Sequence, residues 1–255
     1  MSLVNAPKSA AALYSSLLQS CIGANAFRQG KSVHHRAIIT ASSDPSPPDL
    51  LHLSTKLVMF YSHFGDVAAA RAVFDGMPHR SVVSWTAMVS GYAKNGRAPE
   101  ALELFALMLR SGARPNQFTF GSAARACAGG RCARSGEQVH ACAAKGRHAG
   151  DMFVQSALMD MHLRCGSVGD ARRLFAEMER KDLVSWNALM RGFVERGHYS
   201  DALGLFASML RDGMIMNSCP FAVCMQLNTH LLLYHSASLH PIVSSQKKKE
   251  RNRYT

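Results

Sequence analysis

Val83-Ser84-Trp85-Thr86-Ala87 is the stretch of this sequence that decides its fold, because it returns 101 residues later as Val184-Ser185-Trp186-Asn187-Ala188. The same shift superposes Ala70-Arg71 on Ala171-Arg172, and no gap is needed between the two stretches. Self-similarity at a fixed period is the sequence signature of a repeat architecture. The chain is therefore expected to be a tandem array of related units.

A shorter helical period lies inside the long one. In four places an alanine, an aliphatic residue, a phenylalanine and a methionine fall at i, i+3, i+4 and i+7, a spacing that puts them on one face of a helix. The four sets are Ala70, Val73, Phe74 and Met77; Ala101, Leu104, Phe105 and Met108; Ala171, Leu174, Phe175 and Met178; and Ala202, Leu205, Phe206 and Met209. A second apolar stripe, Trp85, Met88 and Tyr92, precedes the second set, and the turn Asn95-Gly96 separates the two. Each unit is therefore predicted to be a helix-turn-helix hairpin.

A third element carries the pattern in altered form. Gly30-Lys31-Ser32-Val33-His34 and Gly136-Glu137-Gln138-Val139-His140 share the signature Gly-x-x-Val-His, but they stand 106 residues apart. The five extra residues fit a loop insertion in the Pro-rich stretch Ser42–Pro48. The units then measure 31 or 35 residues, and because no unit buries its apolar face alone, they must stack. The sequence predicts an all-α solenoid of about six helix-turn-helix repeats.

The charge balance favours a polyanionic partner. The 255 residues include 29 Lys and Arg against 17 Asp and Glu, which gives a net charge of +12. Seven cysteines with no secretory signal before them fit a reducing compartment, where a free thiol behaves as a small hydrophobic group. No run of 18 apolar residues occurs, so no membrane span is predicted.

Signatures of catalysis and metal binding are missing from the sequence. The His-x-Glu and Cys-x-x-Cys elements of a zinc deaminase are absent, and so are a Gly-rich phosphate loop and a Gly-x-Ser-x-Gly elbow. Cys127-x4-Cys132 and Cys219-x4-Cys224 lack a second half with ligand spacing. We therefore expect no enzyme activity, no metal ion and no cofactor.

Units of 35, 35 and 31 residues in a fixed order resemble the plant pentatricopeptide repeat (PPR) family, in its PLS subclass of long, short and standard motifs, without that subclass's C-terminal extension or deaminase domain. The resemblance covers residues 11–217. The long motifs are 11–50 and 117–151, the short ones 51–81 and 152–182, and the standard ones 82–116 and 183–217. A short N-terminal segment, 1–10, precedes this repeat array, and a divergent basic tail, 218–255, follows it. The family implies a right-handed alpha-alpha superhelix whose groove holds single-stranded RNA, with about one base per repeat.

The resemblance also implies which residues bind RNA, because the family reads each base with the fifth and the last residue of a motif. The pairs are Thr55 with Ser81, Thr86 with Asn116, Ser156 with Asp182, and Asn187 with Asn217. By the family's rules the second pair suggests adenine, the third guanine and the fourth a pyrimidine, while the first is ambiguous between bases. The long motifs offer Gly121 with Asp151 and Ser15 with Leu50, and no base is assigned to them.

Structural roles are open for the same residues. Serine, threonine and asparagine near helix starts are commonly N-caps or solvent-facing polar groups. Trp85 and Trp186 have the chemistry to stack on bases, but they lie on the apolar stripe, which favours core packing. Asp66, Glu100, Asp170 and Asp201 open second helices, where acids favour the positive end of the helix dipole.

The function implied by the resemblance is that of an RNA-binding specificity adaptor in organellar RNA metabolism. A monomer would select a site on single-stranded organellar RNA, and a separate enzyme would perform C-to-U editing or transcript processing there. The stretch before Asp44 contains basic residues and no acid and is rich in Ser and Ala, which is typical of an organelle transit sequence. We expect the mitochondrion, with the chloroplast as alternative. A protein-binding scaffold of tetratricopeptide type and a truncated product without function remain competing hypotheses.

Overall fold

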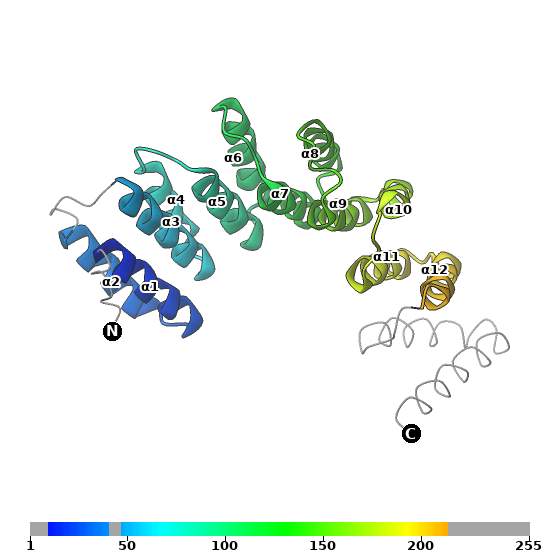
Figure 1. The fold of residues 1–255 in the computed structure, drawn as a ribbon, viewed down its shortest axis with the longest axis horizontal. Coiled ribbons are helices and arrows are strands. Elements are labelled where there is room, and N and C mark those ends of the chain that lie inside the picture. Colours follow the sequence, from blue (N-terminus) through cyan, green and yellow to red (C-terminus); the bar gives the residue numbers. More distant parts are fainter. Residues whose placement is uncertain (1–9, 41–46, 214–255) are drawn as a thin grey trace, which may run out of the picture. The chain divides into compact units, whose positions relative to one another are not determined.

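The computed structural model describes residues 10–40 and 47–213, and these residues form twelve α-helices and no strand (Figure 1). The helices are α1 (Ala10–Gly23), α2 (Phe27–Thr40), α3 (Pro47–His63), α4 (Val67–Asp75), α5 (Val82–Lys94), α6 (Ala98–Arg110), α7 (Gln117–Gly130), α8 (Ala133–Lys145), α9 (Met152–Cys165), α10 (Val168–Glu177), α11 (Leu183–Glu195) and α12 (Tyr199–Arg211). The all-helical prediction is confirmed. The tail 218–255 and all of the segment 1–10 except Ala10 lie outside the described residues.

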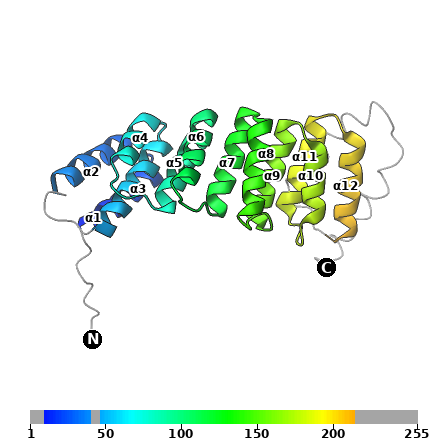
Figure 2. The same cartoon turned by 90° about the horizontal axis from the view of Figure 1, so that it is seen from above.

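Consecutive helices form hairpins. In the compact unit that ends at Met178, α1 packs on α2, α3 on α4, α5 on α6, α7 on α8, and α9 on α10 (Figure 2). The first helices of these hairpins, α1, α3, α5, α7 and α9, also pack on one another in sequence order. A second compact unit begins at Glu179, and in its described part α11 packs on α12.

The stretch Ser42–Pro48, expected to be a loop, is helical from Pro47, where α3 begins, and residues 42–46 lie outside the described residues. The first N–H groups of a helix have no partner within the helix, so the first turn tolerates proline. The proline-rich composition therefore marks a helix start.

The 101-residue repetition extends to the backbone conformation of the turns. Six glycines adopt positive φ, and they form three pairs that are each related by that shift: Gly65 and Gly166, Gly96 and Gly197, and Gly112 and Gly213. Glycine is the residue that enters this left-handed region without a steric cost. The same three turns are therefore built into both copies of the pattern.

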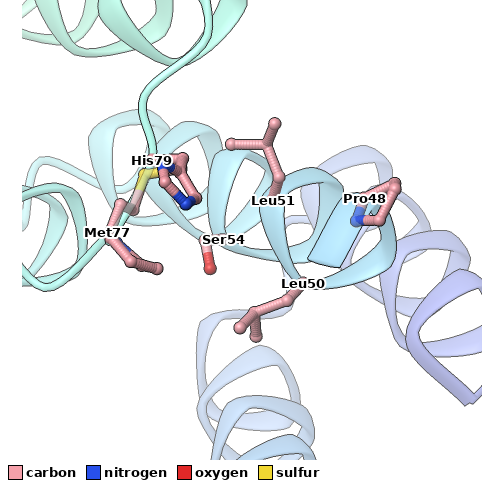
Figure 3. A pocket seen from close by; sticks show the side chains of 7 residues that line it. Pro48, Leu50, Leu51, Ser54, Met77 and His79 are labelled. Carbon is pink, nitrogen blue, oxygen red and sulfur yellow. The ribbon is translucent and has the colours of Figure 1, made fainter. Parts of the chain in front are cut away.

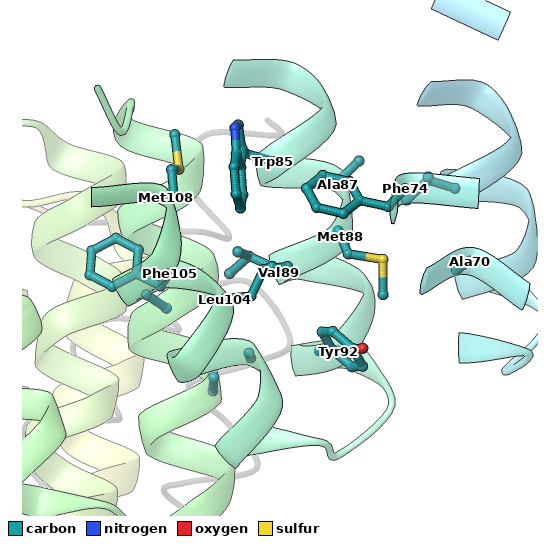
Figure 4. Close-up of a cluster of buried hydrophobic side chains, with 14 of the residues drawn as sticks. Ala70, Phe74, Trp85, Ala87, Met88, Val89, Tyr92, Leu104, Phe105 and Met108 are labelled. Atoms are coloured by element: carbon teal, nitrogen blue, oxygen red, sulfur yellow. The ribbon is translucent and has the colours of Figure 1, made fainter. Parts of the chain in front are cut away.

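Both tryptophans belong to the core, as their place on the apolar stripe predicts. Trp85 is 5% exposed, and its ring meets that of Phe74 edge-on at 5.0 Å between centroids (Figure 4). Trp186 is 3% exposed. The guanidinium of Arg80 covers the Phe74 ring at 5.0 Å, and its Nε donates a hydrogen bond to the Phe74 carbonyl at 3.1 Å. Arg80 thereby closes the C-terminal end of α4.

The four acids expected at second helices have the predicted structural role. Asp66 is the N-cap of α4 and accepts a hydrogen bond from the Ala69 amide at 3.0 Å. Glu100, Asp170 and Asp201 lie in the first turns of α6, α10 and α12. Carboxylates at these places neutralise the positive ends of the helix dipoles.

Cys127 also behaves as the sequence predicts. The side chain is fully buried in α7, and burial is the main cause that raises the pKa of its thiol to about 12, with smaller contributions from Cys132 and Cys165. A thiol with such a pKa holds its proton and is a poor nucleophile. Cys21, Cys127, Cys132 and Cys142 carry free thiols.

Candidate nucleic-acid interface

In four motifs the last residue is the N-cap of the next motif's first helix: Ser81, Asn116, Asp151 and Asp182. The Ser81 hydroxyl accepts a hydrogen bond from the Ser84 amide at 3.2 Å, the Asn116 Oδ1 from the Thr119 amide at 3.0 Å, and the Asp182 Oδ1 from the Ser185 amide at 2.8 Å. These three capping side chains are half-buried. These residues therefore act as N-caps, which is the structural role that the sequence left open. It fixes one face of each side chain and leaves the other toward solvent.

The fifth residues lie on the first helices: Thr86, Ser156 and Asn187 follow their N-caps by a little more than one turn, and Thr55 lies about two turns after the start of α3. Thr86 is half-buried, and its Oγ1 lies 2.7 Å from the Val82 carbonyl oxygen. Thr55 is only 6% exposed, and its hydroxyl donates to the Leu51 carbonyl at 2.8 Å. Threonine in a helix readily bonds to the carbonyl four residues earlier. Thr55 is thus much less accessible to a ligand than Thr86.

One predicted pair, Thr86 and Asn116, is linked by hydrogen bonds through a third side chain, that of Thr119. Thr86 Oγ1 lies 2.6 Å from Thr119 Oγ1, and Thr119 Oγ1 lies 3.0 Å from Asn116 Oδ1. Thr119 is fully buried, and its hydroxyl also accepts from the Asn116 amide at 3.2 Å, which completes a capping box. The structure therefore brings Thr86 and Asn116 together at the N-terminal ends of α5 and α7.

The other three predicted pairs differ from Thr86 and Asn116 in burial, in hydrogen bonding or in how far the structure describes them. Within residues 10–40 and 47–213, no hydrogen bond joins Thr55 to Ser81. Ser156 is half-buried in α9 of the first compact unit, and Asp182 belongs to the second unit. Asn217 lies outside the described residues. Its expected partner, Asn187, is half-buried in α11, and its buried Oδ1 atom has no hydrogen-bond partner among the described residues.

Sequence reasoning missed a row of exposed apolar side chains at the second position of the motifs. Val83 is 58% exposed, Phe118 54%, Phe153 40% and Val184 66%. A signal was present, because all four are apolar, share one motif position and lie off the buried i, i+3, i+4, i+7 stripe. Of the four, Phe118 and Phe153 lie side by side, so these two form a continuous exposed apolar surface.

The second long motif replaces the polar fifth residue with an aromatic face. A Cβ atom on Gly121 would lie 2.4 Å from a ring carbon of Phe153, so the phenyl ring occupies the place of a fifth side chain. The Phe118 ring lies 5.6 Å from the Phe153 ring, and the guanidinium of Arg125 lies 5.9 Å from the Phe153 ring centre. This repeat offers aromatic surface and one cation instead of a hydrogen-bonding pair.

Two cavities flank the first helices of the N-terminal unit. One of about 470 Å³ is mainly apolar and lies between the start of α3 and the connection from α4 to α5 (Figure 3). Its lining residues are Pro48, Leu50, Leu51, Ser54, Met77, Pro78 and His79. The other, of about 310 Å³, is lined by residues of α1, α3 and α5 together with Asn95, and it includes Lys94 and the buried Ser62 hydroxyl, which has no hydrogen-bond partner. Neither cavity contains a predicted base-reading residue.

Nowhere in the described part of the chain do three or more His, Cys, Asp or Glu side chains gather as a metal site requires. None of the helices α1 to α12 has the length and apolar character of a bilayer span.

Hairpins with regular capping side chains and a regular row of exposed apolar residues define an α-helical repeat protein. Comparison with protein families identifies the repeat: a model of the PPR repeat family matches residues 80–129, and a PPR repeat model matches residues 156–183 and 184–214. The chain belongs to the PPR repeat family.

Curated relatives support this assignment. A putative mitochondrial pentatricopeptide repeat-containing protein of Arabidopsis thaliana is 34% identical over 228 residues, which are 89% of this chain and 36% of the relative. A chloroplastic one from the same plant is 36% identical over 207 residues, 81% of this chain and 33% of the relative. The chain thus spans about a third of the length of these relatives.

A solved structure supports the fold. The pentatricopeptide repeat protein PPR10, crystallised in complex with an 18-nt psaJ RNA element, superposes with a TM-score of 0.64 at 22% identity. The match covers 88% of this chain and 34% of PPR10. The chain therefore has the helical-hairpin repeat fold of PPR proteins.

Proposed function

We propose that this protein binds single-stranded RNA with base selectivity and, without catalytic machinery of its own, directs a separate editing or processing enzyme to its target. The observation that carries the proposal is the hydrogen-bonded set Thr86, Thr119 and Asn116, with the exposed side chains Val83 and Phe118 close by in sequence. The PPR10 complex with RNA supports it by analogy.

The geometry suits an unstacked base. A single-stranded base exposes a hydrogen-bonding edge and two apolar faces, and proteins commonly bind both. Thr86 and Asn116 provide polar atoms for the edge, and the apolar second residues provide surface for a face. The net charge of +12 attracts the phosphate backbone.

The proposed contacts follow the PLS division into long, short and standard motifs. The RNA-binding residues are Thr55, Ser81, Thr86, Asn116, Ser156, Asp182, Asn187 and Asn217. Thr86 with Asn116 would select adenine, Ser156 with Asp182 guanine, and Asn187 with Asn217 a pyrimidine. Thr55 has its hydroxyl buried and bonded to its own helix, so Ser81 is the more accessible member of that pair.

The proposed place of action is an organelle. Relatives carry mitochondrial and chloroplastic names, and the basic, acid-free stretch before Asp44 is typical of a transit sequence. We propose the mitochondrion, with the chloroplast as alternative. There the protein would act as a monomer on transcripts that undergo C-to-U editing or maturation.

A gel-shift titration against single-stranded RNA, duplex RNA and DNA tests this function. We expect the single strand to bind best, and we expect the double variant Thr86→Ser, Asn116→Asp to move the preference at one nucleotide from adenine to guanine. Equal binding to all three nucleic acids, unaffected by the double variant, would contradict base reading. Failure to bind any of them would favour the protein-binding scaffold.

A further inference from the structure

The hydroxyl protons of Thr86 and Thr119 can be counted. Each hydroxyl holds one proton, and the contact between the two oxygens at 2.6 Å requires one of the two. The other proton goes either from Thr86 to the Val82 carbonyl at 2.7 Å or from Thr119 to Asn116 Oδ1 at 3.0 Å. In both arrangements the proton of Thr86 stays inside the protein. Toward a ligand, Thr86 Oγ1 is therefore only an acceptor.

The orientation of the Asn116 carboxamide follows from the same contacts. Its Oδ1 faces the amide of Thr119 at 3.0 Å and the hydroxyl of Thr119 at 3.0 Å, and both of these groups can donate. Asparagine amide orientation is assigned from such a network, and here the network directs the oxygen inward. The NH2 group has no hydrogen-bond acceptor within residues 10–40 and 47–213, so it is available as a donor.

We propose that Thr119, the third residue of the following motif, is a positioning residue that sets the base preference of the Thr86 and Asn116 pair; this inference rests on the proposed function. Thr119 is fully buried and does not touch RNA. Its hydroxyl ties the two side chains together and holds them as one acceptor beside one donor. Adenine offers the complementary N6 donor and N1 acceptor on its Watson–Crick edge.

The contact is particular to this repeat. Ser84 and Ser185 stand at the equivalent third positions and are also fully buried, but their hydroxyls donate to the backbone carbonyls of Ser81 and Asp182 at 2.9 and 2.8 Å. A buried hydroxyl at the third position can therefore bond only to the N-cap residue of its own helix. Ser84→Ala is a matched control, because it removes such a hydroxyl without touching Thr86 or Asn116.

The test uses the full chain and a pool of single-stranded RNA with randomised positions, selected on the protein and sequenced. The wild type and Asn116→Asp are compared first, and the nucleotide whose preference differs between them is the one that faces this pair. Thr119→Val then removes the hydroxyl while keeping the shape of the side chain. We expect selection for adenine at that nucleotide to fall about fivefold, the worth of one hydrogen bond, with the other nucleotides unchanged.

Controls separate positioning from stability. Thr119→Ser restores the hydroxyl and should restore the selection for adenine. Ser84→Ala should keep the wild-type selection for adenine, even if it lowers the melting temperature as Thr119→Val does. Where Asn116 is already Asp, Thr119→Val should have no further effect on the preference, because there is no carboxamide left to orient. If the protein does not accommodate valine at this position, Thr119→Ala removes the same hydroxyl with a smaller side chain and is used in place of Thr119→Val.

The outcomes are distinguishable. If Thr119→Val keeps the wild-type preference, or lowers binding to every RNA by one factor with the ratios intact, the positioning role is wrong and the proposed function stands. If the wild type itself shows no base preference at any nucleotide, the proposed function fails, and the role of Thr119 fails with it.

Discussion

At the scale of single residues, a polar side chain can cap a helix and still offer a group to a ligand. Asn116 caps α7 through its oxygen and keeps its NH2 group for another partner, so a cap is no argument against binding. The resemblance to the PPR family implied Asn116 and Thr86 as a pair. It could not predict Thr119, because that residue belongs to the next motif and its hydroxyl is directed by tertiary packing.

Phe118 and Phe153 give the first residue-scale prediction. Replacing either by alanine should weaken binding of single-stranded RNA by about 1–3 kcal/mol, the usual worth of an aromatic ring stacked on a base. Thermal stability should change little, because both rings are exposed. Leu109→Ala is the control, since Leu109 is 39% exposed but lies on the second helix α6. Equal losses for all three variants would show that the second positions have no special role.

His162 gives a residue-scale prediction about pH. It is 4% exposed, and its Nε2 lies 3.0 Å from His140 Nδ1; burial first, and then His140, lower its pKa below the ordinary value, against smaller opposite effects of Asp170 and Glu137. The unfolded chain therefore binds a proton more readily than the folded one, and stability falls as pH drops below about 6.5. Melting curves between pH 7.5 and 5 should record the loss.

The repeat supplies a control for this pH effect. Tyr61 occupies the equivalent position in the first short motif, and its hydroxyl lies 2.8 Å from His34 Nδ1. His162→Tyr should therefore be accommodated and should flatten the pH dependence. Part of the dependence should remain, because burial also lowers the pKa of His34. A pH profile unchanged by His162→Tyr would exclude this pair as its source.

At the scale of helices, periodicity predicted every hairpin of the array, while composition misplaced one boundary. Apolar stripes at helical spacing are set by core burial and can be read along the chain. The start of α3 at Pro47 was read as a loop, because proline favours loops and helix starts alike. The burial of Thr55, in contrast to Thr86, depends on how neighbouring helices cover it, and no local pattern carries that information.

Helix packing gives an element-scale prediction at Gly91. A Cβ atom there would lie 2.2 Å from Ser62 Oγ and 2.8 Å from Ser62 Cβ, so α5 approaches α3 too closely for any larger residue. Gly91→Ala should destabilise the protein by about 1–3 kcal/mol in urea titrations, since overpacking forces a backbone shift. Gly129→Ala, in α7 with no atom within 4 Å of the added carbon, should instead leave stability unchanged or raise it by up to about 1 kcal/mol. Similar losses for both variants would show that the close approach is unimportant.

At the scale of the whole molecule, charge decides how strongly an RNA backbone is attracted. Five cations and one acid at residues 247–253 account for +4 of the net +12, which leaves +8 on the rest of the chain. We expect the affinity for single-stranded RNA to fall roughly ten- to a hundredfold between 50 and 200 mM salt, as about three to five phosphate contacts would require. Filter binding at several salt concentrations measures the slope. A variant that ends at residue 246 should keep most of this slope if the repeats hold the RNA, whereas a slope that vanishes with the tail would mean that the repeats contribute little to phosphate binding.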